Sequence, residues 1–267
     1  MRSLPLYWRF ISISVRAKTE YRTAFALTFL ARGIVWTTEF ALIWVLLYTF
    51  KSIAGWTSYE VMFLYALQLT TYSLAAFFCF HPFTKLSYKI QSGEFDELLT
   101  KPINPLLYLM CREFSASYVA NVTFGIAFLS ICIYRLELTL GVSDVLFLLA
   151  VLAGGALIQA SAFMYGAIPS FWMVRNTSIM EMLMSDFRSF IRYPISIYPS
   201  SVQVILTLLV PFAFINFYPA HYFLGRDDSD LFHPLLVYMT PLVGVVLFGG
   251  ALLLWRAGVR RYHSTGS

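Results

Sequence analysis

Residues 85–105, KLSYKIQSGEFDELLTKPINP, carry three acidic and three basic side chains between two apolar runs. The run before them, residues 61–80, has no charged side chain, and neither has the run after them, residues 114–134. About 20 apolar residues suffice for a helix to cross a bilayer. Because charged side chains are costly at membrane depth, we expect residues 85–105 to form a hinge in water between two membrane spans.

The composition of the whole chain also indicates that most of it lies in a lipid bilayer. Of its 267 residues, 59% are hydrophobic and 12% are charged, whereas about 25% of the residues of a soluble domain are charged. The mean hydropathy is +0.70. A soluble protein of this length would lack the polar surface to cover itself, so we expect an all-α integral membrane protein.

Six apolar runs are the candidate membrane spans of a single domain, residues 1–267. They are residues 24–50, 61–80, 114–134, 145–174, 200–217 and 235–255. His81 and Pro82 are expected to end the second span. The fifth span is the least regular, because four prolines interrupt residues 193–224. One crossing with broken flanks and a re-entrant excursion near residues 216–224 are both compatible with these prolines.

Two polar segments are expected at the membrane surface. Residues 1–23 interleave five basic side chains with aromatic and aliphatic ones, a pattern typical of a helix that lies flat among lipid headgroups. A basic tail that only sets topology is the alternative. Residues 175–192 are polar and methionine-rich, and we interpret them as an interfacial or cytoplasmic helix. Trp56, between the first two spans, is expected in the aromatic belt at the interface.

The basic side chains are distributed unevenly between the two sides of the membrane. Six spans place both termini on one side, with five Lys or Arg in residues 1–23, four in residues 85–112, three in residues 175–192 and three in the C-terminal tail. The opposite side has three, Lys51, Arg135 and Arg226. Because cytoplasmic loops carry the excess of basic residues, the termini and the hinge are predicted to be cytoplasmic. This distribution accounts for the net charge of +5 without a nucleic-acid partner.

Arg32 and Glu39 interrupt the first span and form a candidate intramembrane polar pair. Seven residues apart, they fall on the same face of a helix. They would line a substrate route in one interpretation. In the other, which we favour, a neighbouring helix or subunit satisfies the charge, and Arg32 extends to the inner surface.

The sequence carries no constellation that predicts catalysis. No Gly-rich loop ends in GKS or GKT, so the chain is not expected to bind ATP phosphates in the P-loop manner. The four histidines and three cysteines lack the spacings of metal ligands. Glu94, Asp96 and Glu97 have no accompanying histidine and are interpreted as a solvated elbow. We therefore expect neither an enzyme nor a metal site.

Three segments resemble one branch of the bacterial type-2 ABC exporter permeases. In residues 90–109, IQSGEFDELLTKPINPLLYL, a Gly-Glu-acidic-Leu-Leu-basic-Pro element follows the second span. The tail LLLWRAGVRRYHSTGS and residues 191–220, with their spaced prolines and closing YPA, are similar to the same branch. Lys101 stands where Arg is more usual in the branch, which keeps the charge.

The resemblance implies a six-span permease of the bacterial inner membrane. Two such permeases, identical or paralogous, would work with cytoplasmic ABC ATPase subunits that bind ATP and Mg²⁺, and the chain would contact membrane lipids. Residues 85–112 would form the cytoplasmic coupling segment, whose short coupling helix docks in a groove on the ATPase. The residues assigned to this coupling are Gly93, Glu94, Phe95, Asp96, Glu97, Leu98, Leu99, Lys101 and Pro102.

Within this coupling segment, each residue has an expected role. Gly93 permits the helix boundary, the acidic residues suit the helix N-terminus, and Pro102 would stop the helix. Phe95, Leu98 and Leu99 would share one side and fill the apolar groove of the partner. A non-transport assembly or sensor subunit that docks a soluble partner through the same hinge is the alternative function. The transported substrate is not predicted.

Overall fold

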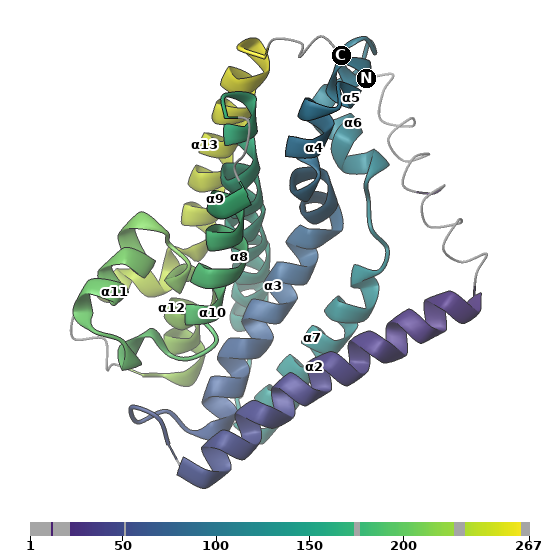
Figure 1. The fold of residues 1–267 in the computed structure, drawn as a ribbon. Helices are drawn as coiled ribbons and strands as arrows, with labels where there is room; N and C mark the ends of the chain where they lie inside the picture. Colours follow the sequence, from purple (N-terminus) through teal and green to yellow (C-terminus); the bar gives the residue numbers. More distant parts are fainter. Residues whose placement is uncertain (1–11, 13–21, 51, 174–176, 227–232, 263–267) are drawn as a thin grey trace.

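The structure, a computed structural model, describes residue 12 and residues 22–50, 52–173, 177–226 and 233–262. Within these residues the chain is built from helices, and its only strand-like pairing is an isolated bridge between Ile53 and Trp56. Figure 1 shows long helices gathered into one bundle. The surface helix predicted for residues 1–23 lies almost wholly outside the described residues.

Among the residues that the structure describes, five helices are long and apolar enough to cross a membrane. They are α2 (Arg22–Phe50), α3 (Ser58–Thr84), α7 (Tyr118–Arg135), α8 (Val142–Ala167) and α13 (Thr240–Arg260). A sixth crossing is present if the bent pair Ser200–Leu209 and Ala213–Leu224 counts as one span. The expected all-α membrane fold is therefore confirmed in the described part of the chain, with five to six candidate spans.

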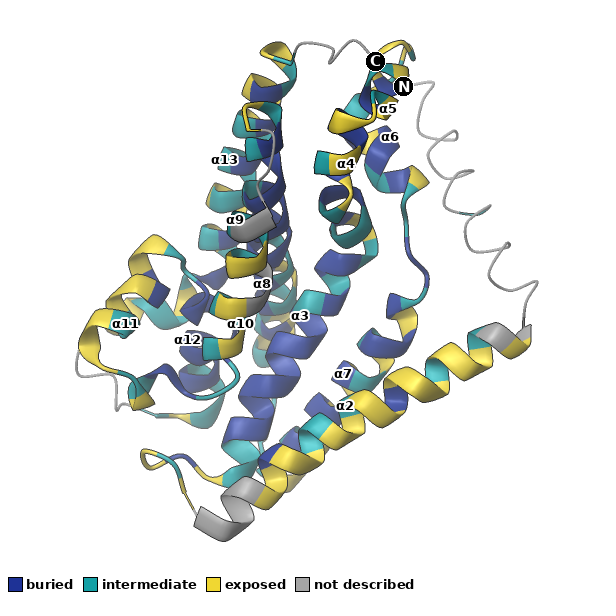
Figure 2. Ribbon diagram, viewed as in Figure 1, coloured by how far each residue is buried: buried dark blue, intermediate teal, exposed yellow. Residues whose placement is uncertain are grey.

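The helix α3 forms the centre of the bundle and α2 lies at its edge. In the most apolar stretch of α3, 83% of the residues are buried, whereas in that of α2 only 11% are buried. Figure 2 shows the contrast, with α2 mostly yellow and α3 mostly dark blue. Most of α2 therefore faces lipid or another protein chain.

Close helix crossings depend on glycines. A Cβ on Gly154 of α8 would lie 2.7 Å from the Cα of Pro241 in α13, and a Cβ on Gly244 of α13 would overlap the carbonyl of Gly154. A Cβ on Gly125 of α7 would lie 3.2 Å from the Cα of Thr70 in α3. Small residues let membrane helices approach until their backbones touch, so these glycines set how closely α8 packs on α13 and α7 on α3.

The second span is longer than predicted, because His81 and Pro82 do not end it. The helix continues to Thr84, and after a one-residue turn α4 (Leu86–Gln91) extends it. Proline removes one backbone donor from a helix. The hydroxyl of Thr84 donates to the carbonyls of Phe80 and His81, at 2.8 and 3.2 Å, and holds the turn around Pro82 together.

The helix predicted for residues 175–192 is present in its described part and packs along the side of the bundle, half-exposed. They form α9 (Thr177–Glu181), the π-helical turn η2 (Met182–Asp186) and α10 (Phe187–Phe190). The amide of Gln68 in α3 donates to the carbonyl of Arg188 over 2.8 Å, and the amide of Asn216 donates to that of Ile191 over 2.6 Å. Arg188 and Arg192 are half-buried there, and their described partners are the ring of Tyr72 and the carboxylate of Glu39.

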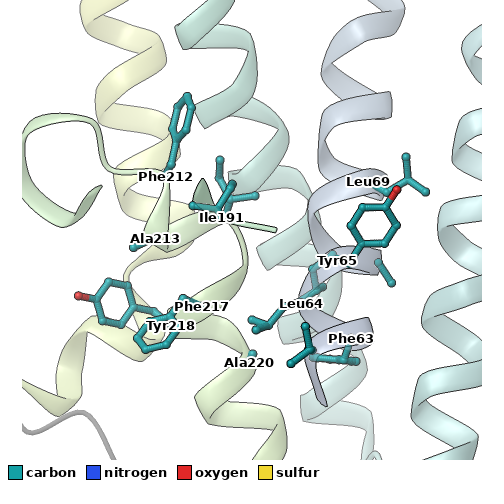
Figure 3. Close-up of a cluster of buried hydrophobic side chains, with 14 of the residues drawn as sticks. Phe63, Leu64, Tyr65, Leu69, Ile191, Phe212, Ala213, Phe217, Tyr218 and Ala220 are labelled. Carbon is teal, nitrogen blue, oxygen red and sulfur yellow. The ribbon is translucent and has the colours of Figure 1, made fainter. Parts of the chain in front are cut away.

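The fifth span is not the straight crossing predicted for residues 200–217. The helix α11 (Ser200–Val204) continues as η4 (Ile205–Leu209), and α12 (Ala213–Leu224) leaves at 104° to this pair. Pro211 lies in the break and cannot donate a backbone hydrogen bond. All residues of 212–221 are buried, so the irregular backbone beside them lies against protein. In Figure 3, Phe217 and Ala220 of α12 point toward Leu64 of α3.

The remaining spans begin at other residues than predicted. The helix α7 begins at Tyr118 instead of 114, and α8 begins at Val142 and passes at Ala167 into the 3₁₀ turn η1 (Ile168–Phe171). The helix α13 begins at Thr240, after the 3₁₀ turn η5 (Pro234–Tyr238). Uncharged residues also occur in turns, so an apolar run fixes the presence of a span better than its ends.

Two buried clusters divide the interior. One gathers residues of α3, α7 and α12 and includes Trp56, which is fully buried against Phe217 and His221. The ring of Trp56 therefore packs within the chain at one end of the bundle. The other cluster joins α5 (Glu94–Leu99) to η1 and α13. We call the two ends of the bundle the Trp56 end and the α5 end.

Candidate functional site

The predicted coupling segment forms three short helices at the α5 end. The turn between α4 and α5 is made by Gly93, whose φ is +75°, a left-handed conformation that costs glycine little. The helix α6 (Pro105–Arg112) starts at Asn104, whose side chain accepts hydrogen bonds from the amides of Leu106 and Leu107 at 3.0 and 3.3 Å. Pro102 does not end α5, which stops at Leu99. The amide of Thr100 donates to the carbonyl of Asp96 and closes the last turn.

The apolar side of α5 faces the protein itself and not a partner. The exposed fraction is 0% for Phe95 and 1% for Leu98, against 38% for Leu99. The ring of Phe95 packs edge-on against Phe171 of η1, Trp255 of α13 and Tyr262, with ring centroids 5.2, 6.1 and 5.0 Å apart. The prediction that Phe95, Leu98 and Leu99 together fill a partner's groove is wrong for the first two, because η1 and α13 supply an aromatic groove within the chain.

The outer side of α5 is open. Glu94, Glu97 and Leu99 are exposed, and so is Pro102 in the following turn. Asp96 is half-buried beside Tyr262, where burial and, less strongly, the Asp96 carboxylate raise the pKa of Tyr262 to about 12. The Nζ of Lys101 lies 2.8 Å from Oε1 of Glu97, and this contact lowers the pKa of Glu97 and raises that of Lys101.

Lys89 joins the three short helices from a buried position. Its Nζ lies 3.0 Å from Oε1 of Glu113 and 3.5 Å from Oε2 of Glu94, and Lys85 reaches the other Glu113 oxygen at 3.3 Å. Burial acts to raise the pKa of Glu113, but the two lysines outweigh it, and the pKa lies below its ordinary value. Nothing local in the sequence indicates that Lys89 is buried, because its two partners come from different turns.

Arg32 and Glu39 are not brought together. Oε2 of Glu39 accepts a hydrogen bond from the Tyr65 hydroxyl at 2.9 Å and lies 3.7 Å from the guanidinium of Arg192. Arg32 is exposed, and no described carboxylate pairs with it. A neighbouring helix thus satisfies Glu39, as the favoured interpretation of the sequence had it.

Around Glu39 lies a polar pocket that sequence reasoning missed. It opens between α2, α3 and the segment after α10, and its polar walls are Glu39, Tyr65, Gln68, Tyr72, Arg188 and Arg192. The residues come from three parts of the chain far apart in sequence. Only the charges in residues 175–192 signalled it, and they were assigned to the membrane surface.

At the Trp56 end, Arg226 ties the end of α12 to the turn before α3. Its guanidinium lies 3.1 Å from Oε2 of Glu60, donates to the carbonyl of Gly55 over 3.1 Å, and stacks 4.4 Å from the centre of the Trp56 ring. Glu60 also accepts a hydrogen bond from the amide of Thr57 at 2.7 Å, which caps α3. These contacts fix the C-terminal end of α12 to the start of α3, the central helix of the bundle.

The part of the chain that the structure describes gathers no three His, Cys, Asp or Glu side chains that could hold a metal ion. Its arrangement is that of a polytopic membrane protein, with helices of membrane length, ion pairs between them and a short exposed helix fixed to one end.

The comparison with protein families identifies which kind. The family model described as ABC-2 family transporter protein matches residues 34–266, most of the chain. The chain belongs to this ABC-2 transporter family, and the resemblance to type-2 permeases is thereby confirmed. Comparisons with curated proteins and with solved structures find no match.

Proposed function

We propose that this chain is the transmembrane permease subunit of an ATP-driven exporter of the bacterial inner membrane. ATP and Mg²⁺ are bound and hydrolysed on separate cytoplasmic ABC ATPase subunits, so that this chain is not itself an enzyme. A second six-span permease, identical or paralogous, completes the complex in the lipid bilayer, and no nucleic acid takes part. The chain converts the movement of the ATPases into export.

The observation that carries the proposal is the two-sided character of α5. Its inner side, Phe95 and Leu98, is buried against the bundle, while Glu94, Glu97 and Leu99 are exposed at the end of the molecule. A soluble partner that binds the exposed side pushes on a helix that is packed firmly against the spans. This is what mechanical coupling to an ATPase requires.

Two routes lead from α5 into the spans. Phe95 contacts Trp255 of α13, and α13 packs on α8 where Gly244 meets Gly154. Lys89 pairs with Glu94 at the start of α5 and lies on α4, which extends α3. Displacement of α5 therefore moves α3 and the α8–α13 pair, whereas α2, with few buried residues, is free to separate from them.

The distribution of basic residues supports a cytoplasmic α5 end. Arg188 and Arg192 contact Tyr72 and Glu39 along the side of the bundle, so we leave them out of the count. Of the 15 Lys and Arg first assigned to the side of the termini, this leaves 13, against Lys51, Arg135 and Arg226 on the other. Such an excess marks the cytoplasmic side, where ATP is available.

Copurification from cells that produce the whole complex tests this function. The wild-type chain is expected to recover an ATPase with a P-loop, and Leu99→Asp is expected to lose it while the chain still inserts and folds, because a carboxylate enters the docking surface. Leu98→Asp is unsuitable, since Leu98 is buried. Leu235→Asp, at the Trp56 end with an exposed fraction of 62%, is the matched control and should leave recovery unchanged. Recovery of no ATPase by the wild-type chain in mild detergent contradicts the proposal.

A further inference from the structure

The polar pocket around Glu39 lies beside the middle of the uncharged run 61–80 of α3, the part of this helix expected in the membrane. Gln68, on its wall, is the eleventh residue of α3. At 1.5 Å per residue it lies about 15 Å from the N-terminal end of this helix. The hydrocarbon core is about 30 Å thick. Charges at this depth are costly and mark functional positions in membrane proteins.

The charges in the pocket do not balance. Arg192 pairs with Glu39, with 3.7 Å between the guanidinium and the carboxylate. Arg188 instead lies 4.2 Å over the ring of Tyr72, and no described carboxylate forms an ion pair with it. One guanidinium charge in this pocket therefore has only an aromatic face as its described partner.

A second polar group beside it is unsatisfied. The amide nitrogen of Gln68 donates to the carbonyl of Arg188, but the amide oxygen of Gln68 is buried with no hydrogen-bond partner among the described residues. The amide thus holds the backbone of Arg188 and keeps unused hydrogen-bonding capacity next to its guanidinium. An amide oxygen accepts hydrogen bonds, so only a donor, such as the hydroxyl of a singly protonated phosphate ester, would satisfy it.

The size and opening of the pocket restrict what fits. The enclosed space is about 20 Å³, room for one group of the size of a water molecule. It is not sealed, because the side chains of Glu39 and Arg192 are 30% and 41% exposed. Trp36 and Leu69 give it apolar walls. One oxygen atom of a charged group fits inside, and the rest of that group and of its molecule must remain outside, beside apolar surface.

We propose that this pocket binds the anionic oxygen group of a membrane-embedded amphiphile, a carboxylate, phosphate or sulfate, with Arg188 as the group that recognises it. Guanidinium binds such oxygens through charge-assisted hydrogen bonds. Glu39, held by Arg192 and Tyr65, repels a second anion and leaves room for one. The inference rests on the proposed function only in that the amphiphile is the exported cargo, since its binding needs no ATPase.

Binding of dodecyl phosphate to the full chain in phosphatidylcholine nanodiscs tests the proposal. Saturable binding is expected, at least about tenfold tighter than that of dodecyltrimethylammonium, which has the same chain and the opposite charge. Inorganic phosphate is expected to compete poorly, because it lacks the apolar tail. Competition by inorganic phosphate as strong as by dodecyl phosphate would show a free anion as the ligand, and equal binding of the cation would show no charge recognition. Either result overturns the proposal.

Variants of the arginine locate the binding. Arg188→Gln is expected to weaken dodecyl phosphate binding about tenfold or more, and Arg188→Lys to weaken it less because the charge stays. Arg135→Gln is the matched control, since Arg135 also lies over a tyrosine ring, Tyr59, at 6.0 Å, but at the Trp56 end. If Arg188→Gln does not fold, Gln68→Leu takes its place, with an expected loss of about threefold, because the carbonyl of Arg188 then loses the donor that holds its backbone. Unchanged affinity in the folded variant overturns the proposal, whether or not the chain recovers an ATPase.

Discussion

Phe95 of α5 packs edge-on against Trp255 of α13, with the two ring centroids 6.1 Å apart. The two residues are far apart in the sequence, and their contact fixes the short exposed helix to the last membrane span. Because Phe95 is fully buried there, α5 cannot move far without moving α13 or breaking this contact. The predictions below follow from this link and from the packing around it.

Replacing Phe95 by alanine should destabilise the protein strongly. Loss of a fully buried aromatic ring costs about 3 kcal/mol or more, and here it also frees α5 from η1 and α13. Leu99→Ala, on the exposed side of the same helix, should cost less than about 1 kcal/mol. Chemical denaturation of the purified chain in detergent measures both. Equal losses for the two variants would contradict the burial of Phe95.

Lys89 and Lys85 should differ in their contribution although both pair with Glu113. The side chain of Lys89 is 8% exposed and that of Lys85 is 55% exposed. Lys89→Met leaves Glu113 partly buried with a weaker partner and should cost about 2 kcal/mol. Lys85→Met should cost between about 0 and 1 kcal/mol. Chemical denaturation in detergent measures both losses. A larger loss for Lys85→Met than for Lys89→Met would contradict the burial of Lys89.

The α5 end should loosen in acid. The pKa of Glu113 in the folded protein lies below the ordinary 4.5 of an unfolded chain. Its contribution to stability is therefore complete above that value and is lost as the pH falls through the lowered pKa. Proteolysis at the turn after α5, followed from pH 7 downward, should accelerate below about pH 4.5 in the wild type. Glu113→Gln should remove most of this pH dependence of proteolysis. An unchanged acid profile in that variant would show that Glu113 is not the group responsible.

Two glycines of α13 should respond oppositely to alanine. Gly244→Ala places a methyl group on the backbone of Gly154 and should destabilise the chain by about 1–3 kcal/mol through overpacking. Gly249→Ala meets no atom within 4 Å and should be neutral or stabilising by up to about 1 kcal/mol. Thermal unfolding in detergent distinguishes them. Equal midpoints would mean that α8 and α13 do not cross as closely as described.

The sequence alone predicted the features that depend on residues close together in the chain. Uncharged runs predicted the presence of the spans, because a bilayer excludes charge over a fixed thickness. Gly93 was expected at a helix boundary, and it adopts the left-handed conformation that a side chain disfavours. Glu39 was expected to be satisfied by a neighbouring helix, and its partners Tyr65 and Arg192 are on other elements.

The features that the sequence missed depend on contacts between distant residues. The spacing of Phe95, Leu98 and Leu99 predicts an apolar side, but only the position of Trp255 decides that the chain itself covers most of it. Arg188 was assigned to water because a charge has no local sign of its distant partner, here the ring of Tyr72. Pro211 signalled a break, but the 104° between the two helices is set by packing around it.

Photo-crosslinking from α5 in intact cells tests the central claim, that its exposed side binds the ATPase, most directly. A photoreactive amino acid in place of Leu99 is expected to give a covalent adduct with a cytoplasmic subunit whose peptides contain a P-loop. The same amino acid in place of the buried Leu98 should give crosslinks within the chain. No ATPase adduct from Leu99, or an adduct with a protein on the outer side of the membrane, would contradict the account.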